Sequence, residues 1–345
     1  MITIDGIIFS LQSYGGISVY FRELLNYLEK SKISARLSIE EPVNQKFDFL
    51  LKNILVDYRS SRSLERYRPC RVSDTASVFH SSYYRQPSRR NLPTVVTVHD
   101  FIYERFRRGP ALWAHSFQKY ESIRQAQSII CISESTRDDL MEFVGVRSDQ
   151  KVHIIPNGVS SCFKPVPIGQ SPSPFILFVG DRRGYKNFAL VLDALKYLPG
   201  LNLYCVGGGS LRDDELRLLS PSIRKRVMHM GFVSDNELNV AYNQAVCLVY
   251  PSRYEGFGIP VVEAMKAGCP VVSVNCKAVV EVGGIALERL DEEDPMALAD
   301  AVTRLRDPAY RALRVSAGLH RAGIYDWGVC HEQTVAIYRG LSSKV

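Results

Sequence analysis

The stretch at residues 250–272, YPSRYEGFGIPVVEAMKAGCPVV, decides the fold of this chain. It starts at the end of one short apolar run, 247–250, and leads into another, 270–274, and both have the length of buried strands. Between them lie a glycine-containing turn and a helical segment that begins near Pro260, a residue suited to the first turn of a helix. The stretch therefore predicts a strand–turn–helix–strand unit with parallel strands.

The turn and helix of this stretch also carry candidate ligand-binding residues. Gly256 and Gly258 flank Phe257 and leave backbone N–H groups open to a ligand. Glu255 and Glu263 bracket the element with seven residues between them, and two carboxylates beside a nucleotide can accept hydrogen bonds from sugar hydroxyls. As a purely structural residue, Glu263 would be a first-turn acid that the helix dipole favours. That alternative explains one residue of the string, so we interpret the string as functional.

The same alternation of strands and helices extends along the whole chain. Short β-branched runs are followed by amphipathic stretches of helical length, which is typical of a doubly wound α/β fold with parallel sheets. The further strands that we expect are 94–98, 128–132, 152–155, 175–179 and 201–206.

A break in this pattern predicts two domains. Residues 163–174, FKPVPIGQSPSP, replace periodicity with prolines, glycine and serines, as an interdomain linker does. We expect one doubly wound domain at 1–164 and a second at 165–326. The last amphipathic stretch, about 327–345, has no strand after it and is expected to pack back on the first domain.

The loop after the strand at 175–179 reads GDRRGYKN and precedes the expected helix FALVLDALKYL. Gly180 allows close approach of the backbone, and Arg183 and Lys186 stand where cations oppose the positive end of the helix dipole. A bound anion would reverse that cost, so both cations are candidates for holding a pyrophosphate, with an ordinary surface turn as the alternative. The spacing matches neither a P-loop nor the G-x-G-x-x-G fingerprint.

The composition indicates a well-buried cytoplasmic protein. The chain has 345 residues, of which 46% are hydrophobic and 23% charged, and its eight cysteines are scattered without a C-x-x-C pair. We expect these cysteines to be reduced residues of the core. The start MITIDGIIFS lacks the basic and apolar parts of a signal peptide, and no apolar run approaches the ~20 residues that cross a bilayer. We expect a soluble protein, at most peripheral on a membrane.

Positive charge is concentrated in one part of the chain. Residues 52–108 hold twelve Lys or Arg and five Asp or Glu, which gives 12 − 5 = +7, and the whole chain has the same formal charge of +7. A basic, tyrosine-rich stretch of this kind can contact anionic lipid headgroups, nucleic acid or a lipid pyrophosphate, or simply be solvated. No nucleic-acid module is evident, so an anionic membrane is the better partner.

The quoted stretch resembles a family signature. E-G-F-G-x-P-x-x-E-A-M-x-x-G-x-P-V-V, with its E-x₇-E spacing, is similar to the motif of retaining glycosyltransferases of family 4, which have the GT-B fold of two facing Rossmann-like domains. The likeness extends over nearly the whole chain. Its other motifs are the glycine loop with Gly15 and Gly16, VTVHD ending near His99, CISESTRDDL, IPNGV, the cationic pair Arg183 and Lys186, the turn at 207–209, GFVSDNEL and the helix after Trp327.

The resemblance implies roles for these residues in an interdomain cleft. Arg183 and Lys186 would stabilise the departing nucleoside diphosphate, Glu263 would hold the ribose hydroxyls, and Glu255 would contact the donor sugar together with the backbone of 256–258. His99 would approach the sugar from the first domain, although without the resemblance it would be a structural histidine at a strand end. Gly15, Gly16 and Gly180 would line the donor site.

Neither a metal nor a cofactor is expected, because cations and amides would serve the phosphates and no D-x-D motif is present. One departure from the family pattern is Val280, which stands where a proline often precedes the acid corresponding to Glu281 and leaves the donor-sugar loop less defined.

The substrates follow only from overall likeness to bacterial surface-polysaccharide enzymes. GDP-mannose is the leading donor, with UDP-sugars behind it, and the acceptor would be a saccharide on undecaprenyl pyrophosphate at the inner leaflet, as in O-antigen synthesis. Three alternatives have other chemistry: a Rossmann dehydrogenase, which lacks its fingerprint here; a nucleotide-sugar epimerase of the same fold; and a non-catalytic sugar-nucleotide binder.

Overall fold

The chain forms two compact units in a computed structural model that describes residues 1–12, 15–42, 51–107, 109–167, 169, 173–217 and 219–342, with only the backbone described at 110–112. Unit 1 comprises Met1–Gly158 and Trp327–Val345, and unit 2 comprises Val159–Asp326. The division falls a few residues before the domain boundary that the proline-rich stretch suggested.

Unit 1 is built on a parallel sheet of seven strands in the order β3-β2-β1-β4-β5-β6-β7. The strands are β1 (Ile2–Asp5), β2 (Ala35–Glu41), β3 (Ile54–Ser60), β4 (Val78–Ser81), β5 (Thr94–Val98), β6 (Ser128–Cys131) and β7 (Lys151–Ile154). The chain builds outward in one direction from β1 and in the other from β4. Ligands of doubly wound sheets bind at the carboxyl ends of the strands beside such a switch point.

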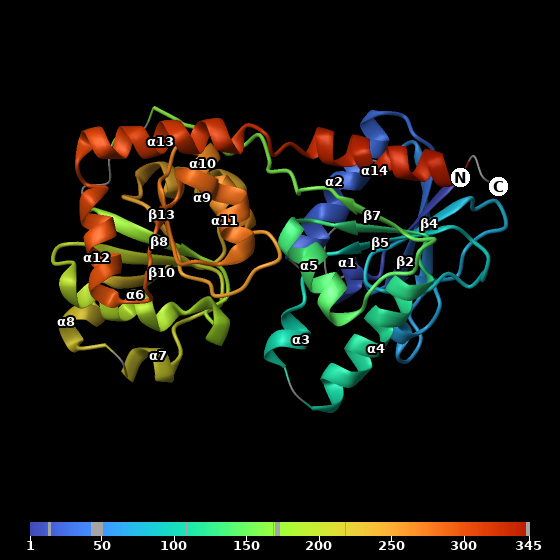
Figure 1. Ribbon diagram of the computed structural model, residues 1–345, viewed down its shortest axis with the longest axis horizontal. Helices are drawn as coiled ribbons and strands as arrows, with labels where there is room; N and C mark the ends of the chain where they lie inside the picture. Colours follow the sequence, from blue (N-terminus) through green and yellow to red (C-terminus); the bar gives the residue numbers. More distant parts are fainter. Residues whose placement is uncertain are drawn as a thin grey trace. The chain divides into compact units, whose positions relative to one another are not determined.

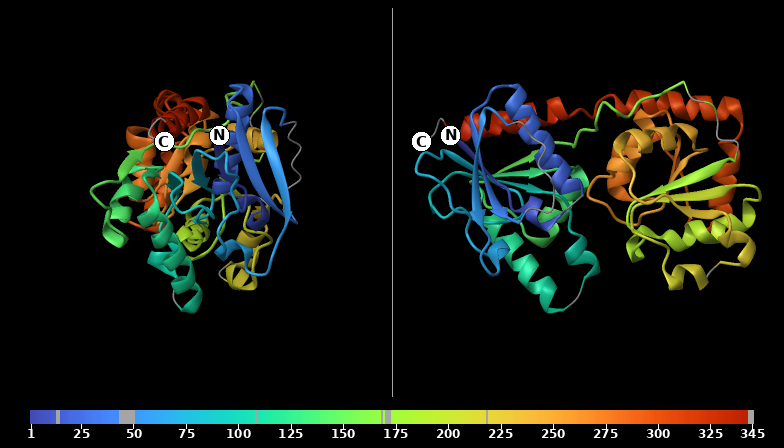
Figure 2. Two further views of the ribbon diagram at one scale, coloured as in Figure 1. Left: turned by 90° about the vertical axis from the view of Figure 1, so that its right-hand side faces the viewer. Right: turned by 180° about the vertical axis from the view of Figure 1, so that it is seen from behind.

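Helices cover both faces of this sheet. They are α1 (Ile8–Leu11), α2 (Gly16–Lys30), α3 (Ile102–Phe106), α4 (Pro110–Gln125), α5 (Glu134–Phe143) and α14 (Trp327–Ser342), with the 3₁₀ turn η1 at Glu65–Tyr67. Helices α2 and α14 pack together on one face, and α4 lies on the other (Figure 1). The Met1 amino group donates to Ser77 Oγ, which lies 3.3 Å from Ser342 Oγ, so the amino terminus and the end of α14 lie together (Figure 2).

Unit 2 contains a parallel sheet of six strands in the order β10-β9-β8-β11-β12-β13. The strands are β8 (Phe175–Val179), β9 (Asn202–Val206), β10 (Val227–His229), β11 (Leu248–Tyr250), β12 (Val271–Ser273) and β13 (Glu288–Arg289). The direction of winding reverses between β8 and β11, which therefore flank the switch point of this sheet.

The helices of unit 2 also form two layers. They are α6 (Phe188–Ala194), α7 (Asp213–Arg217), α8 (Pro221–Arg224), α9 (Asp235–Gln244), α10 (Ile259–Lys266), α11 (Lys277–Gly283), α12 (Pro295–Arg304) and α13 (Pro308–Ala322), with the 3₁₀ turns η2 (Gly184–Lys186), η3 (Leu195–Tyr197) and η4 (Gly284–Ala286). Helices α6 and α12 pack on one face, and α10 and α13 on the other (Figure 1). Asp294 and Asp307 cap α12 and α13 through side-chain oxygens, each before a proline at the first helical position.

All seven strands expected from the sequence are present, with ends that differ by at most one residue. The helix expected after Lys186 differs more. Residues 184–186 form a 3₁₀ turn, Asn187 has left-handed backbone angles, and α6 ends at Ala194. The expected helix thus begins at Phe188 as expected, but Leu195–Tyr197 form a 3₁₀ turn in place of its last α-helical turn.

The eight cysteines are free thiols, and seven of them are buried, as expected of core residues. Within the described parts of the chain, no helix has the length and apolar character needed to span a bilayer.

Candidate functional site

The loops after β8 and β11 meet at the switch point of the unit 2 sheet. Lys186, in the loop after β8, places its Nζ 2.5 Å from Oε1 of Glu255, in the loop after β11. Lys186 Nζ also donates to Tyr250 Oη at 3.4 Å and lies 5.3 Å from the centre of that ring. Both side chains of the ion pair are largely shielded from solvent. The structure thus joins two predicted site residues that are 69 positions apart in sequence.

Backbone geometry fixes these two loops relative to each other. The Arg253 N–H donates to the Tyr185 carbonyl at 2.8 Å, which ties the loop after β11 to the turn that carries Lys186. Gly180 has a φ of 131°, and a Cβ there would come 4.0 Å from Lys186 Nζ. A side chain at this position would be strained because of the positive φ, and its Cβ would just reach van der Waals contact with the ammonium group. Gly180 therefore keeps the lysine approachable at the carboxyl end of β8.

Arg183 is placed differently from Lys186. Its side chain is 60% exposed and forms an ion pair with Asp181, and no ion pair among the described residues joins it to Glu255 or Glu263. Arg183 and Lys186 precede α6 as expected, but a 3₁₀ turn and Asn187 stand between them and this helix, which is only seven residues long. Their charges are balanced by the carboxylates of Asp181 and Glu255.

Arg182 is a structural residue that the sequence pattern did not reveal. Its buried guanidinium pairs with Glu215 at 3.0 Å and donates to the carbonyls of Gly207, Gly209 and Ser210. Gly208 has a φ of 71°, and a Cβ there would lie 2.9 Å from Arg182 Nη1. The arginine thus holds the loop after β8 against the glycine turn after β9.

Glu263 lies in the second turn of α10, so it is not the first-turn acid of the structural alternative. Its Oε2 accepts a hydrogen bond from Tyr242 Oη at 3.0 Å. Loss of hydration, with a smaller effect of Asp235, raises the pKa of Glu263 to about 7. No hydrogen bond or ion pair within the described ranges links Glu263 to Glu255, and the two acids face different neighbours.

The Gly256–Phe257–Gly258 turn is anchored by its aromatic side chain. Phe257 is buried and packs edge-on against Tyr325, with ring centres 5.5 Å apart. Gly258 has a φ of 105° and precedes α10, and a Cβ there would touch Val279. The glycine conformation and the buried Phe257 together set the path of the backbone between Glu255 and α10.

His99 follows β5 at the carboxyl edge of the unit 1 sheet. It is buried, its ring lies 5.3 Å from that of Tyr20, and its Nε2 has no hydrogen-bond partner within the described part of the chain. Burial, with a smaller effect of Lys119, lowers the pKa of His99 to about 3. The imidazole is therefore neutral near pH 7 and has one ring nitrogen left for a ligand.

Gly15 and Gly16 lie at the start of α2, after β1. Gly15 precedes the helix with a φ of 172°, which is ordinary extended backbone, and its carbonyl accepts from Val19 N and Ser18 Oγ. Gly16 is exposed at the first helical position. Residues 13 and 14, which precede them, lie outside the described residues.

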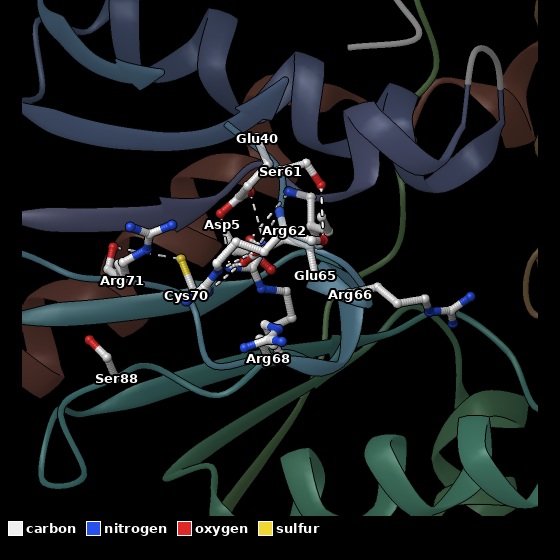
Figure 3. A network of polar contacts seen from close by, with 12 residues as sticks. Asp5, Glu40, Ser61, Arg62, Glu65, Arg66, Arg68, Cys70, Arg71 and Ser88 are labelled. Carbon is white, nitrogen blue, oxygen red and sulfur yellow. Dashed lines mark hydrogen bonds and ion pairs between the residues drawn. The ribbon is translucent and has the colours of Figure 1, made fainter. Parts of the chain in front are cut away.

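The basic stretch 52–108 is less uniformly charged in the fold than in the sequence. Arg85 is fully buried and forms ion pairs with Asp5, Glu40 and Glu65, the last of which also binds Arg62 at 2.7 Å. Figure 3 shows how these acids from β1, β2 and η1 converge. Arg59 and Arg105 also pair with carboxylates. A single solvated basic face is therefore a wrong description of this stretch, whose last residue, Arg108, lies outside the described residues.

Two cavities of unit 1 lie away from the predicted site residues. One of about 550 Å³ lies between β7 and α14 and is lined by Lys151, His153 and Gln333, among others. Within the described residues, no group of three or more His, Cys, Asp or Glu side chains is arranged to hold a metal ion.

Two family models match the chain, one on each unit. Residues 14–161 match the model described as Glycosyltransferase Family 4, and residues 173–307 match the model described as Glycosyl transferases group 1. The matched ranges contain His99 in the first case, and Arg183, Lys186, Glu255 and Glu263 in the second.

Curated relatives agree with these matches. An O-antigen chain mannosyltransferase B of Escherichia coli is 30% identical over 237 residues, which cover 64% of this chain and 62% of that protein. A serotype-specific mannosyltransferase WbdA of Escherichia coli is 26% identical over 267 residues, which cover 69% of this chain and 32% of that protein. The chain thus spans less than two thirds of either relative.

Solved structures share the fold over almost the whole chain. A sucrose-phosphate synthase from Thermosynechococcus elongatus has a TM-score of 0.80 at 19% identity, with 100% of this chain and 99% of that chain covered. WaaG, a glycosyltransferase involved in lipopolysaccharide biosynthesis, has a TM-score of 0.74 at 15% identity, with coverages of 99% and 100%. Together with the two parallel sheets, these neighbours identify the fold as GT-B.

Proposed function

Since the chain belongs to the family 4, group 1 glycosyltransferases, we propose that it transfers a hexose from a nucleoside-diphosphate sugar to an acceptor hydroxyl with retention of anomeric configuration. The observation that carries this proposal is the Lys186–Glu255 pair at the switch point of the unit 2 sheet, where nucleotides bind in doubly wound folds.

Lys186 is the group that we assign to the leaving diphosphate. Its ammonium is shielded from bulk water, so its interaction with a phosphate oxygen is stronger than it would be at an exposed site. Arg183 is exposed, its one ion pair among the described residues is with Asp181, and it can exchange that carboxylate for a phosphate. In this proposal both cations stabilise the charge that develops on the diphosphate as its bond to the sugar breaks, and Gly180 leaves room for the phosphates.

The reaction that we propose keeps attack and departure on one face of the sugar. The bond between C1 and the diphosphate oxygen breaks, the acceptor oxygen bonds to C1 from the same side, and the acceptor proton passes to an oxygen of the departing diphosphate. No protein nucleophile is needed. We assign no metal and no cofactor, because the cations and the backbone N–H groups of 256–258 supply the interactions with the donor.

The carboxylates and the unit 1 residues have binding roles in this proposal. Glu263 holds the ribose hydroxyls, and Glu255 contacts the donor sugar while it orients Lys186. His99 offers its unpartnered Nε2 to the sugar. Gly15 and Gly16, at the amino end of the fifteen-residue helix α2, lie beside the phosphates.

The donor sugar is proposed as mannose, carried by GDP. This choice is supported by the names of two relatives, the O-antigen chain mannosyltransferase B and the serotype-specific mannosyltransferase WbdA. The acceptor is then a saccharide on undecaprenyl pyrophosphate in surface-polysaccharide synthesis. In this proposal the protein works in the cytoplasm, bound peripherally to the anionic inner leaflet.

Membership of the family argues against the dehydrogenase and epimerase alternatives. A UDP-sugar remains the second candidate donor, since a similar fold, HepE of Anabaena, has been solved in complex with UDP and glucose. Its TM-score is 0.70 at 15% identity, so it supports the fold and does not identify the nucleobase of the donor.

A thermal-shift panel tests the proposed donor. Purified protein is heated with GDP-mannose, UDP-glucose, UDP-GlcNAc, GDP and UDP, since a ligand that binds only the folded state raises the apparent stability. We expect the largest stabilisation from GDP-mannose. If only UDP-sugars raise the melting temperature, the donor is a UDP-sugar and not GDP-mannose. Incubation of the donor without an acceptor tests the epimerase alternative, because an epimerase would convert the donor sugar alone.

A further inference from the structure

We propose that a pocket between η1 and α4 of unit 1 binds the phosphate and the first part of the hydrocarbon chain of a lipid phosphate. The inference rests on the proposed acceptor class, because it locates the lipid carrier on unit 1. The pocket has a volume of about 350 Å³. Its lining includes Tyr67, Arg68, Tyr84, Phe117, Gln118 and Glu121.

Two arginines near this pocket have no acidic partner. No ion pair within the described residues involves Arg66 or Arg68, in contrast to Arg62 and Arg85 of the same region. Arg66 is not on the pocket lining; its guanidinium lies over the rings of Tyr67 and Tyr83, and its buried Nε and Nη2 have no hydrogen-bond partner among the described residues. Arg68, which lines the pocket, is exposed and donates only to the carbonyl of Ser63. Arg68 is thus an exposed cation on the pocket lining that can pair with a phosphate, and Arg66 adds a second positive charge to the same segment.

The buried charge network holds this segment in place. Glu65, the first residue of η1, is bound by Arg85, which itself pairs with Asp5 and Glu40. In Figure 3 the side chain of Arg66 extends away from these carboxylates and does not pair with them. Gln118 of α4 donates to the Arg66 carbonyl at 2.5 Å and ties η1 to the helix. The arginines are thus carried by a fixed segment.

Exposed aromatic side chains continue from the pocket along α4. Phe117, on its rim, is 70% exposed, and Trp113, one turn earlier on the same stripe of the helix, is 76% exposed. Tyr67 contributes a further exposed ring, over which the Arg66 guanidinium lies at 4.9 Å. Large aromatic side chains exposed at i and i+4 beside unpaired cations match an anionic head joined to an apolar chain.

The opposing charges of the pocket are already neutralised. Glu121, on the same lining, lies 3.5 Å from Arg124 and accepts from Gln125. Arg85, also on the lining, is paired with three buried acids, so it has no positive charge left over for a ligand. Among the described lining residues, the cation without an acidic partner is therefore Arg68, and its sign selects an anion.

Tryptophan fluorescence gives a direct test. The chain has two tryptophans, and Trp327 is buried against His331, so a change in environment on ligand binding is reported by Trp113. The probes are farnesyl phosphate, farnesol and inorganic phosphate, with no nucleotide-sugar present. We expect farnesyl phosphate to shift the emission to shorter wavelength saturably, with an affinity at least tenfold above that of either partial probe. Trp113→Phe should lose the shift.

A matched pair of arginine variants distinguishes binding at the pocket from nonspecific attraction of the anion to positive charge. Arg68→Ala removes an exposed cation of the pocket, and Arg90→Ala removes an exposed cation that lies just before β5, outside the pocket lining. We expect the first to weaken farnesyl phosphate binding at least fivefold and the second by less than twofold. Phe117→Ser should also weaken it several-fold.

Several results would overturn the proposal. One is equal binding of farnesol and farnesyl phosphate, and another is an equal effect of the two arginine variants. A third is a shift produced by phosphatidylglycerol-containing vesicles with none from farnesyl phosphate, which would indicate a membrane surface and not a lipid site. The lipid-binding test contains no nucleotide-sugar, and the thermal-shift panel contains no lipid. Failure of one of these experiments therefore does not change the result of the other.

Discussion

The Lys186 ammonium lies 2.5 Å from the Glu255 carboxylate, and this contact joins the two loops that flank the switch point of the unit 2 sheet. The lysine follows β8 and the acid follows β11, so each comes from the carboxyl end of a neighbouring strand. A buried pair of this kind holds a cation in a defined position before the substrate arrives, which is the preorganisation that electrostatic catalysis requires.

Glu263 should make nucleotide binding depend on pH. Its pKa of about 7 means that the carboxylate is protonated below that value, and a protonated acid is a poorer acceptor for ribose hydroxyls. We therefore expect the dissociation constant of the nucleoside diphosphate to rise several-fold from pH 8 to pH 6. Titration calorimetry of the wild type and of Glu263→Gln measures this. An unchanged pH dependence in the variant would remove Glu263 from that role.

The glycine turn after β9 allows a matched test of the Arg182 contact. Gly208 and Gly209 have nearly equal φ values of 71° and 72°, but only a Cβ at Gly208 would meet Arg182. Gly209→Ala should lower the free energy of unfolding by about 1 kcal/mol through backbone strain. Gly208→Ala should cost about 1–2 kcal/mol more, because the arginine must give up carbonyl contacts. Equal losses in chemical denaturation would contradict the structural role of Arg182.

Much of the fold was predictable because buried parallel strands have a simple signature. The run at 94–98 consists of valine and threonine and that at 175–179 is uniformly apolar; both are β-strand formers, and β5 and β8 coincide with them. Strands β2 and β3 were not expected, since Arg36, Glu40 and Asp57 interrupt their apolar character. Those charges are tolerated because Arg36 pairs with Asp57 across the two strands and Glu40 pairs with Arg85.

The sequence motifs predicted candidate site residues but not the contacts between them. The motif pointed to Lys186 and Glu255, but their pairing depends on the order of β8 and β11 in the sheet, which no local pattern reports. The buried role of Arg182 was hidden because its neighbour Arg183 has the same chemistry and only the fold distinguishes them. The pocket beside α4 was missed because Trp113 and Phe117 resemble core residues in sequence.

The buried arginine of unit 1 should be essential for stability. Arg85→Met leaves Asp5, Glu40 and Glu65 without their shared partner, and breaking such a buried network costs about 3–5 kcal/mol. Arg62→Met removes the other, surface-exposed partner of Glu65 and should cost about 1 kcal/mol or less. Urea denaturation followed by tryptophan emission reports on unit 1, which holds both tryptophans. Similar losses in the two variants would contradict this account.

The buried histidines should make unit 1 sensitive to acid. Burial lowers the pKa of His80, His99 and His331 to about 3, whereas an unfolded histidine titrates near 6.5. The unfolded state then binds more protons, so this stability is complete above pH 6.5 and is lost as the pH falls toward 3. Each histidine contributes up to about 1.4 kcal/mol per pH unit within that window.

His331→Phe tests this dependence. Both ring nitrogens of His331 lack partners among the described residues, and the ring stacks on Trp327 at 5.2 Å, so phenylalanine can replace it without losing a hydrogen bond. We expect little change in the free energy of unfolding at pH 7.5 and a more stable variant at pH 5. Identical slopes of stability against pH in variant and wild type would show that His331 does not titrate on unfolding.

The most direct measurement of the central claim is the transfer rate of Lys186→Ala with the donor that stabilises the wild type most. If Lys186 stabilises the departing diphosphate, kcat should fall by about 10²–10³-fold, as it does when a preorganised electrostatic donor is removed, while circular dichroism shows an intact fold. Lys186→Arg should recover part of this loss because it restores the charge. A folded Lys186→Ala variant with nearly full transfer activity would contradict the account.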